Sequence, residues 1–380
     1  MLSKDVKMKI LYVTTIGSTM GFFDSLIKIL LADGHTVDMA TNVSISKIPE
    51  RCNGLGCKVY NIDCSRNPLS KSNLKVTKQL KSLVQDGDYD IVHCHTPIAA
   101  ALTRLACRKL RKDGLKVFYT AHGFHFYKGA PFKNWLIYYP IEKICSYMTD
   151  VLITINREDY ARACKKMKAK KVEYVPGVGI DVEKFRDFDF EDCERNEFRS
   201  ELGIPSDAKL LVSVGELNEN KNHQVVLKAV SLLEDKNIHY AIAGEGESAE
   251  QLKNLAKELG ISDRFHLLGY RNDVEKLYKE ADICCLPSFR EGLPVAVIEG
   301  MASGLPIVVA DNRGTRDLCE NGVNGFICNP SSPEEFATAI TKILSDNALK
   351  EKMIQTNIKK AEDFNVKSIN DIMLKIYGIV

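Results

Sequence analysis

Two glutamates, Glu291 and Glu299, stand eight residues apart in the segment SFREGLPVAVIEGMASGLPIVVAD. Glu291 lies in a Gly-Leu-Pro turn that follows an apolar run, 282–288, and Glu299 lies in a helix expected over 294–303, which a second apolar run follows. A strand, an exposed turn, a helix and a parallel strand place ligands at the carboxyl end of a sheet. The free amides and the positive end of such a helix favour a phosphate or another anion. The segment therefore predicts an anion-binding site.

This Glu-x7-Glu block, with Pro-Ser before it and MASGLPIVV after it, resembles the donor site of retaining glycosyltransferases with the GT-B fold, in the large family 4 of bacterial capsule, exopolysaccharide and lipid-linked glycan transferases. The resemblance implies that Glu291 lies beside the transferred sugar and the donor diphosphate, and that Glu299 holds the ribose. The backbone under the sugar and phosphates would be that of Gly292, Leu293, Pro294 and Val295. Each glutamate taken alone would also fit a solvated position on the surface. The two glutamates together with the flanking Pro-Ser and MASGLPIVV favour the donor site.

A second candidate corner follows the strand expected over 209–216. That strand ends near Gly215 and leads through an Asn-rich loop to Lys221, just before a helix. The family usually has Gly-Arg here, with a lysine five residues after the arginine, and Lys221 matches that lysine. The resemblance implies that Lys221 neutralises the donor diphosphate, a type of contact that lowers a barrier by roughly 3–4 kcal/mol. Glu216 occupies the place of the usual arginine, so this chain departs from the family's pattern of two cations that hold the phosphates. The alternative for Lys221 is a solvated lysine at the start of a helix.

The turn at 244–246 satisfies, with the residues after it, the G-x-G-x-x-A fingerprint of dinucleotide-binding folds. It supports an NAD-dependent or flavin-dependent oxidoreductase as an alternative. Two glutamates in the turn would repel a pyrophosphate, and the next strand, 264–270, ends without an acidic residue for a ribose. In the family resembled, Tyr270 and Arg271 at the end of that strand match the position of the nucleotide base.

The first half of the chain offers two further matches. Its first strand ends in TTIGSTMGFF and its fifth in TAHGFHFY. The family has a small-residue turn at the first place, near the donor phosphates, and a histidine at the second, near an outer hydroxyl of the donor sugar. The resemblance therefore implies a donor-binding role for Gly17 and a catalytic role for His122, together with Lys221 and Glu291. A histidine held at the edge of the core is the alternative for His122.

Two patterns that resemble metal sites occur in the same half. His93 and His95 share one face of a strand, but no third ligand lies nearby in the sequence. Asp88 and Asp90 form a D-x-D, the metal motif of a different transferase fold, and we interpret them as a turn and a strand cap. None of the twelve cysteines forms a C-x-x-C pair. We therefore expect no metal site.

Apolar runs alternate with amphipathic segments almost throughout the chain, which predicts doubly wound parallel sheets of an α/β fold. The pattern restarts after PGVGIDVEKF and a polar stretch, which indicates two Rossmann-like domains, 1–185 and 186–363. The resemblance implies the GT-B plan, with a cleft between an acceptor domain and a donor domain and a last helix, within 364–380, that returns to the first. The strands are expected at 9–15, 35–41, 57–63, 90–96, 116–122, 150–156, 171–176, 209–216, 239–245, 264–270, 282–288, 306–311 and 325–329.

The net charge of +2 hides a division. Residues 1–180 hold 28 Lys and Arg against 15 Asp and Glu, whereas the remainder holds 24 against 35. The basic half, and aromatic residues interleaved with lysines over 124–147, favour contact with an anionic membrane, with core packing as the alternative for the aromatic residues. No run of 18 apolar residues occurs, so we expect no membrane span. The cysteines fall mostly inside apolar strands or helices, which fits reduced thiols in a cytosolic protein. Together with the basic half, this predicts a cytoplasmic protein that lies peripherally at the inner face of the membrane. Nucleic acid is not expected, because the second half is acidic.

The resemblance implies a hexosyl- or N-acetylhexosaminyltransferase that retains the anomeric configuration and has no permanently bound cofactor. Its donor would be a nucleotide-sugar, usually a UDP-sugar in this family. The wording TAHGFHFYKGAP is similar to the branch that extends glycans linked to polyprenyl diphosphate, which implies such an acceptor in surface polysaccharide biosynthesis. A UDP-sugar epimerase of the same fold and a non-catalytic binder remain alternatives.

Overall fold

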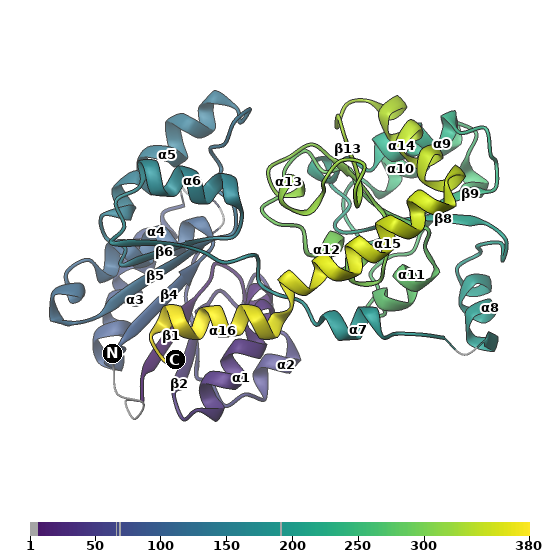
Figure 1. Cartoon of the computed structure of the whole chain (residues 1–380). Helices are drawn as coiled ribbons and strands as arrows, with labels where there is room; N and C mark the ends of the chain where they lie inside the picture. Colours follow the sequence, from purple (N-terminus) through teal and green to yellow (C-terminus); the bar gives the residue numbers. More distant parts are fainter. Residues whose placement is uncertain (1–6, 66, 68–69, 191) are drawn as a thin grey trace. The chain divides into compact units, whose positions relative to one another are not determined.

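The computed structural model describes residues 7–65, 67, 70–190 and 192–380. The chain divides into two compact units: unit 1 runs to Val178 and includes Ile369–Val380, and unit 2 is Gly179–Ser368 (Figure 1). The units divide at 178/179, whereas the boundary expected at 185/186 lies inside unit 2, at the end of helix α7 (Val182–Arg186). That helix packs on helices of unit 2, and the chain turns just before it at Gly177 and Gly179, which both have positive φ.

Unit 1 consists of a parallel sheet with helices on both faces. Its elements are β1 (Lys9–Val13), η1 (Gly17–Phe22), α1 (Asp24–Ala32), β2 (Thr36–Thr41), α2 (Glu50–Asn53), β3 (Val59–Asn61), α3 (Ser72–Gly87), β4 (Ile91–His95), α4 (Pro97–Cys107), η2 (Leu110–Asp113), β5 (Lys116–Ala121), α5 (Phe132–Ser146), β6 (Val151–Thr154), α6 (Arg157–Lys166), β7 (Lys171–Tyr174) and most of α16 (Val366–Tyr377).

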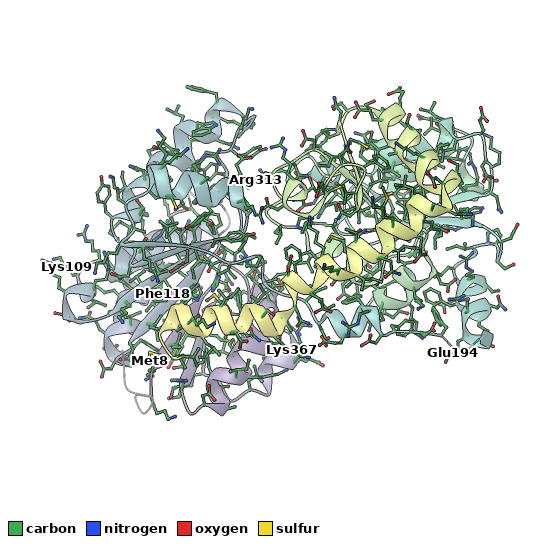
Figure 2. The ribbon with its side chains drawn as sticks, viewed as in Figure 1. Met8, Lys109, Phe118, Glu194, Arg313 and Lys367 are labelled. Atoms are coloured by element: carbon green, nitrogen blue, oxygen red, sulfur yellow. The ribbon has the colours of Figure 1, made fainter. Side chains whose placement is uncertain are left out.

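The seven strands of unit 1 lie in the order β3-β2-β1-β4-β5-β6-β7. One face of this sheet is covered by α3, α4, α5 and α6, and the other by η1, α1 and α16. Both faces carry buried apolar side chains, so the strands read as nearly continuous apolar runs. Figure 2 shows Phe118 of β5 in the interior of this unit and Lys109 at its periphery.

Helix α16 returns to unit 1 and is fixed there by a buried polar group as well as by apolar packing. The hydroxyl of Tyr377 lies 2.7 Å from the hydroxyl of Tyr12 and 2.6 Å from Nδ1 of His93. The other ring nitrogen of His93 lies 2.8 Å from the hydroxyl of Thr120. Because buried polar groups that lose their partners are destabilising, this network specifies where the helix docks.

Helix α5 is held by a buried ion pair with α4. Nη1 of Arg104 donates to Glu142 at 2.9 Å, and both side chains are at least nine-tenths buried. The hydroxyl of Tyr119 on β5 donates to the other oxygen of the same carboxylate, and the guanidinium of Arg104 also lies over the Tyr119 ring. The ion pair therefore fixes which side of α5 faces the sheet.

Unit 2 has the same plan. Its elements are α7, α8 (Asp192–Glu201), β8 (Lys209–Val214), η3 (Glu219–Lys221), α9 (Gln224–Leu232), β9 (Ile238–Ala243), α10 (Ala249–Glu258), η4 (Ser262–Arg264), β10 (Phe265–Leu267), α11 (Val274–Glu280), β11 (Ile283–Leu286), α12 (Val295–Ala302), β12 (Ile307–Ala310), α13 (Thr315–Leu318), β13 (Gly325–Cys328), α14 (Pro333–Ser345), α15 (Asn347–Ala361) and η5 (Glu362–Phe364). The six strands are parallel, in the order β10-β9-β8-β11-β12-β13.

The expected fold class, two doubly wound parallel sheets, is confirmed. Each expected strand is present, and most are shorter than expected at their carboxyl ends. Strand β11, for example, ends at Leu286 rather than at 288, and β10 ends at Leu267 rather than at 270. The residues beyond the strand ends stay apolar or turn-forming, but they leave the sheet to build loops.

None of the helices in residues 7–65, 67, 70–190 and 192–380 combines the length and the apolar character that crossing a membrane requires.

The Arg104–Glu142 pair predicts a specific stability defect. Replacing Arg104 by Met should lower the free energy of unfolding of unit 1 by about 3–5 kcal/mol, because it leaves a buried carboxylate without its cation. Trp135 on α5 is the single tryptophan, so its fluorescence in a urea titration reports on unit 1. The double variant Arg104→Met/Glu142→Gln should recover much of the loss, since Gln still accepts from Tyr119. A double variant no more stable than the single one would contradict this account.

Candidate functional site

The candidate site of unit 2 lies where the strand order of its sheet reverses. Strands β8 and β11 are neighbours, with β9 and β10 on one side and β12 and β13 on the other. The loops that follow β8 and β11 therefore leave in opposite directions and expose the carboxyl ends of both strands. Ligands of doubly wound proteins bind at such a switch point. The loop after β8 contains Gly215 and Lys221, and the loop after β11 contains Glu291.

Asparagine side chains hold these two loops together. Phe289 N–H donates to the carbonyl of Asn220 at 2.9 Å, and the Asn220 amide donates back to the carbonyl of Arg290 at 3.0 Å. The Asn222 side chain, at a residue with φ of 53°, donates to the carbonyl of Pro287 at 3.1 Å. The side chain of Asn312 likewise donates to the carbonyl of Ser288 at 2.9 Å. The backbone of the site is thus preorganised.

The central contact is an ion pair between the two loops. Nζ of Lys221 lies 2.8 Å from Oε1 of Glu291, and both side chains are mostly buried. Gly215 makes room for it, because a Cβ there would lie 3.3 Å from Cε of Lys221 and its φ of 155° disfavours other residues. Three residues singled out from the sequence therefore meet in one place.

The turn that contains Glu291 leads into α12 as expected. Pro294 is the N-cap of this helix, so the helix begins one residue later than predicted, at Val295, and its first amides have no partner within the helix. Gly314 lets the chain pass, because a Cβ there would lie 2.8 Å from the carbonyl oxygen of Gly292. The Leu293 side chain is buried and fixes the turn to the core of unit 2. The Gly292–Val295 backbone thus offers amides next to the ion pair.

Glu299 lies two turns along α12, in a different environment. Burial raises the pKa of the Glu299 carboxyl to about 7, and the nearby charge of Lys184 opposes that rise. The hydroxyl of Tyr278, which also neighbours Glu299, donates at 2.7 Å to the carbonyl of Ala296. A carboxyl group that is kept half-neutral near pH 7 in a binding region is typical of functional sites.

The turns after β9 and β10 border the same end of the sheet. Gly244 and Gly269 form an isolated bridge, and a Cβ on Gly244 would lie 1.9 Å from the carbonyl oxygen of Gly215. Close packing of neighbouring turns therefore accounts for the glycine that opens the G-x-G-x-x-A pattern. Tyr270 is 78% exposed, and Arg271 forms two hydrogen bonds to Asp273, at 2.8 and 2.7 Å.

Glu216, already noted in the sequence, is exposed. Several other residues of this region were not identified from the sequence. Arg313 is buried, and its Nε donates to the carbonyl of Glu291 at 3.2 Å. Arg290 is exposed directly beside Glu291 in the chain. The asparagines at 218, 220 and 222 were visible only as an Asn-rich loop. That composition directly after a strand was the signal that could have indicated a rigid, hydrogen-bonded loop.

Unit 1 has its own switch point, between β1 and β4. Thr15 after β1 and Thr96 after β4 are joined there, with their hydroxyls 2.6 Å apart. Thr96 has φ of 63°, a conformation that costs a β-branched residue about 1–3 kcal/mol and that the sequence did not indicate. Gly17 is buried in η1, and a Cβ there would lie 2.2 Å from the carbonyl oxygen of Ser46. Backbone packing therefore requires a glycine at that position.

His122 follows β5 directly and pairs with a second histidine. Its Nε2 lies 3.1 Å from Nδ1 of His95, whose ring stacks on Phe23. Burial lowers the pKa of His122 to about 4 and that of His95 well below its ordinary value, so both rings are neutral near pH 7. A neutral imidazole can hold one proton for a hydrogen bond to a ligand.

The two patterns that resembled metal sites have structural roles. His93 belongs to the Tyr12–Tyr377 network, and Asp88 ends α3 with φ of 48°. The carboxylate of Asp90 accepts from the backbone N–H of Lys9 at 2.7 Å, as a strand cap. Within the part of the chain that the structure describes, no group of three or more His, Cys, Asp or Glu is arranged to hold a metal ion.

Comparisons with known families agree over both units. Residues 194–360 match the family model described as Glycosyl transferases group 1, and residues 9–156 match the one described as Glycosyl transferase 4-like. A Bacillus subtilis (strain 168) protein named "Putative glycosyltransferase EpsD" is 40% identical over 322 residues, which cover 84% of this chain and 84% of that protein. An Escherichia coli protein named UDP-Gal:alpha-D-GlcNAc-diphosphoundecaprenol alpha-1,3-galactosyltransferase is 28% identical over 80% of this chain and 81% of its own length.

Solved structures share the fold at low sequence identity. Anabaena HepE in complex with UDP and glucose superposes with a TM-score of 0.80 at 18% identity, covering 98% of this chain and 100% of that one. WaaG, a glycosyltransferase involved in lipopolysaccharide biosynthesis, gives a TM-score of 0.76 at 18% identity over 97% of this chain and 99% of its own.

The environment of Glu299 predicts an unusual pH dependence of stability. Its pKa in the folded state, about 7, lies above the value of 4.5 of a free glutamate, so folding favours the protonated form. Stability from this group is present below pH 4.5 and is lost as the pH rises through 7. Replacing Glu299 by Gln should therefore raise the free energy of unfolding at pH 8 by about 1–3 kcal/mol and change it little at pH 5. Urea titrations at both pH values test this, and destabilisation at pH 8 would contradict it.

Proposed function

Because this chain belongs to the group 1 glycosyltransferases of the GT-B fold, we propose that it transfers a sugar from a UDP-sugar to a glycan acceptor linked to polyprenyl diphosphate. The observation that carries the proposal is the Lys221–Glu291 ion pair at the switch point of unit 2. It puts a cation and a carboxylate beside the free amides of α12, where a diphosphate and a sugar have complementary groups.

In the proposed reaction, Lys221 and the amides of α12 stabilise the charge that develops on the leaving diphosphate. The bond between the anomeric carbon and the phosphate oxygen breaks as the acceptor hydroxyl bonds to that carbon from the same face. The hydroxyl proton passes to a donor phosphate oxygen, and the anomeric configuration is retained. Glu291 then needs only to accept hydrogen bonds from the sugar, because no pair of carboxylates has to stand on both sides of the bond as in a glycosidase.

Glu299 is proposed to accept hydrogen bonds from the ribose hydroxyls. Its ionised form is the better acceptor, so a ligand that donates two hydrogen bonds would lower its pKa and recover part of the cost of burying it. Gly17, Gly215, Tyr270 and Arg271 are proposed donor-binding residues, and neutral His122 is proposed to take part in the transfer step. These charges come from the chain itself, so we propose that no protein-bound metal is required.

The donor and acceptor classes are supported by the names of related proteins. HepE has been solved with UDP, and the Escherichia coli relative is named for a UDP-sugar donor and a diphosphoundecaprenol acceptor. EpsD and the family branch favour a role in exopolysaccharide biosynthesis, with a hexosyl or N-acetylhexosaminyl group as cargo. An acceptor on a lipid also favours a peripheral position at the inner face of the cell membrane.

The alternatives make different products. An oxidoreductase has lost its support, because the chain belongs to a transferase family and close packing explains Gly244. A UDP-sugar epimerase of the same fold would need no acceptor and would release a free sugar from the donor alone.

Nucleotide binding gives the first test. In a thermal-shift screen against UDP, GDP, ADP, TDP and NAD, UDP at 100 times its dissociation constant should stabilise the fold by about 2.7 kcal/mol. Glu299→Ala should abolish the shift, and Glu258→Ala, at an exposed glutamate on α10, should not. A shift with NAD alone would overturn the proposal.

Turnover gives the second test. With a UDP-sugar and an undecaprenyl-diphosphate-linked sugar as substrates, Lys221→Met should lower kcat by roughly 10²–10³-fold, because it removes the cation from the leaving group. The product should keep the anomeric configuration of the donor in its proton NMR spectrum, and EDTA should not change the rate. An inverted product would contradict the retaining mechanism, and free sugar formed without acceptor would indicate an epimerase.

A further inference from the structure

The outer surface of α5 is unusually apolar. Among the described residues, six of the fifteen exposed large apolar side chains lie on this helix or at its C-cap, and each is between 41 and 81% exposed. They are Phe132, Leu136, Ile137, Ile141, Ile144 and Tyr147. Their spacing of three or four residues places most of them on one stripe. Contiguous exposed apolar surface of this kind marks a site of interaction with a protein or a membrane.

Helix α5 is apolar on both its inner and its outer face. Aromatic side chains at 135, 138 and 139 pack against the core, and its only acidic residue, Glu142, points inward to Arg104 and Tyr119. Its isoleucines point to solvent. An ordinary amphipathic helix buries its apolar face and exposes its charges. The buried ion pair therefore holds the apolar stripe outward, and rotation of the helix to hide that stripe would leave Arg104 unpaired.

Cationic residues border the stripe. A groove of about 470 Å³ runs between α5 and α6, lined by the aromatic rings of Trp135 and Tyr139 and by Glu158, Arg162, Lys165 and Lys166. Figure 1 shows the two helices side by side at the top of unit 1, on the side of the sheet away from α16. The segment 128–171 holds ten Lys and Arg against four Asp and Glu.

Ion pairs account for the four acidic residues of this segment. Glu142 pairs with Arg104 and Asp150 with Arg111 and Lys170, whereas Glu158 and Asp159 both pair with Arg162 and neutralise it. The positive charge at the groove therefore comes from Lys165 and Lys166. Lys133, Lys165 and Lys166 are exposed beside the apolar stripe. Apolar surface bordered by cations and aromatic rings is complementary to a bilayer with anionic headgroups.

We propose that the outer stripe of α5 and the groove between α5 and α6 form a docking surface for a bilayer that contains anionic phospholipid. The apolar side chains enter the boundary between headgroups and acyl chains, and the groove cations contact lipid phosphates. A second copy of this chain fits less well, because a symmetric interface would bring the lysines of both copies together. The proposed lipid-linked acceptor gives the biological reason for membrane docking, and in that respect the inference rests on the proposed function. The docking itself can be tested without measuring turnover.

Trp135 makes a direct test possible, because it lines the groove and is the single tryptophan. Full-length protein is mixed with vesicles of phosphatidylglycerol and phosphatidylcholine, or of phosphatidylcholine alone. We expect co-sedimentation with the anionic vesicles only, weakened by salt, and quenching of Trp135 emission by lipids with brominated acyl chains. Binding without quenching would show that another surface contacts the bilayer and would overturn the proposal.

Matched double variants locate the surface. Leu136→Ser/Ile144→Ser should weaken vesicle binding on the order of tenfold, whereas Leu74→Ser/Leu232→Ser, at exposed leucines elsewhere, should not. Lys165→Glu/Lys166→Glu should also weaken it roughly tenfold, with Lys228→Glu/Lys257→Glu as the charge control. Equal losses in test and control variants would overturn the proposal.

Two further readouts separate the possible failures. If the Leu136→Ser/Ile144→Ser variant converts a dimer into a monomer on size exclusion, the stripe is an interface between copies and the proposal is wrong. The UDP-induced thermal shift should be unchanged in the Leu136→Ser/Ile144→Ser and Lys165→Glu/Lys166→Glu variants, because all four substitutions lie in unit 1. Loss of that shift in the unmodified protein would refute the proposed function, while vesicle binding with quenching would still support the docking surface.

Discussion

Parallel strands determine most of this structure, because each must be followed by a crossover to reach its neighbour. The order of crossovers reverses once in each sheet, between β1 and β4 in unit 1 and between β8 and β11 in unit 2. At those places two loops diverge and the ends of the strands stay uncovered. The residues with the strongest chemical character, the Lys221–Glu291 pair and the His95–His122 pair, belong to the loops and strand ends around those positions. The strand order therefore fixes which positions are open to a ligand, whatever side chains stand there.

Around those positions the chain accepts arrangements that a stable core would avoid. Thr96 is held with positive φ, and Glu299 is buried far enough that its carboxyl group stays partly protonated near pH 7. Each is unfavourable for folding and each is held by strong neighbouring structure, such as the threonine pair at the β1–β4 junction. These unfavourable local arrangements are thus supported by the apolar cores of the two units.

The sequence predicts the fold well, because buried parallel strands produce short apolar runs that alternate regularly with amphipathic helical segments along the chain. It predicts Glu291, Lys221 and Gly215 together, since they follow adjacent strands of one pattern. It fails where partners come from distant segments: the Asn220 contacts to the 289–290 backbone and the Asn312 contact to Ser288 have no local signature. It also fails for α5, where aromatic and apolar residues read equally as core or surface until Glu142 is seen to face Arg104.

The docking of α16 has a consequence for the order in which the protein folds. The core of unit 1 includes Ile369, Met373 and Tyr377, which are synthesised only after all of unit 2. Domains usually fold in the order in which they leave the ribosome. Here unit 1 emerges first, but the side of its sheet that α16 will cover, including His93, stays uncovered while residues 179–368 are synthesised. Unit 2 can fold during that time. Unit 2 therefore has all of its residues before unit 1 does. Until α16 is synthesised, the incomplete apolar face of unit 1 must be protected from aggregation in another way.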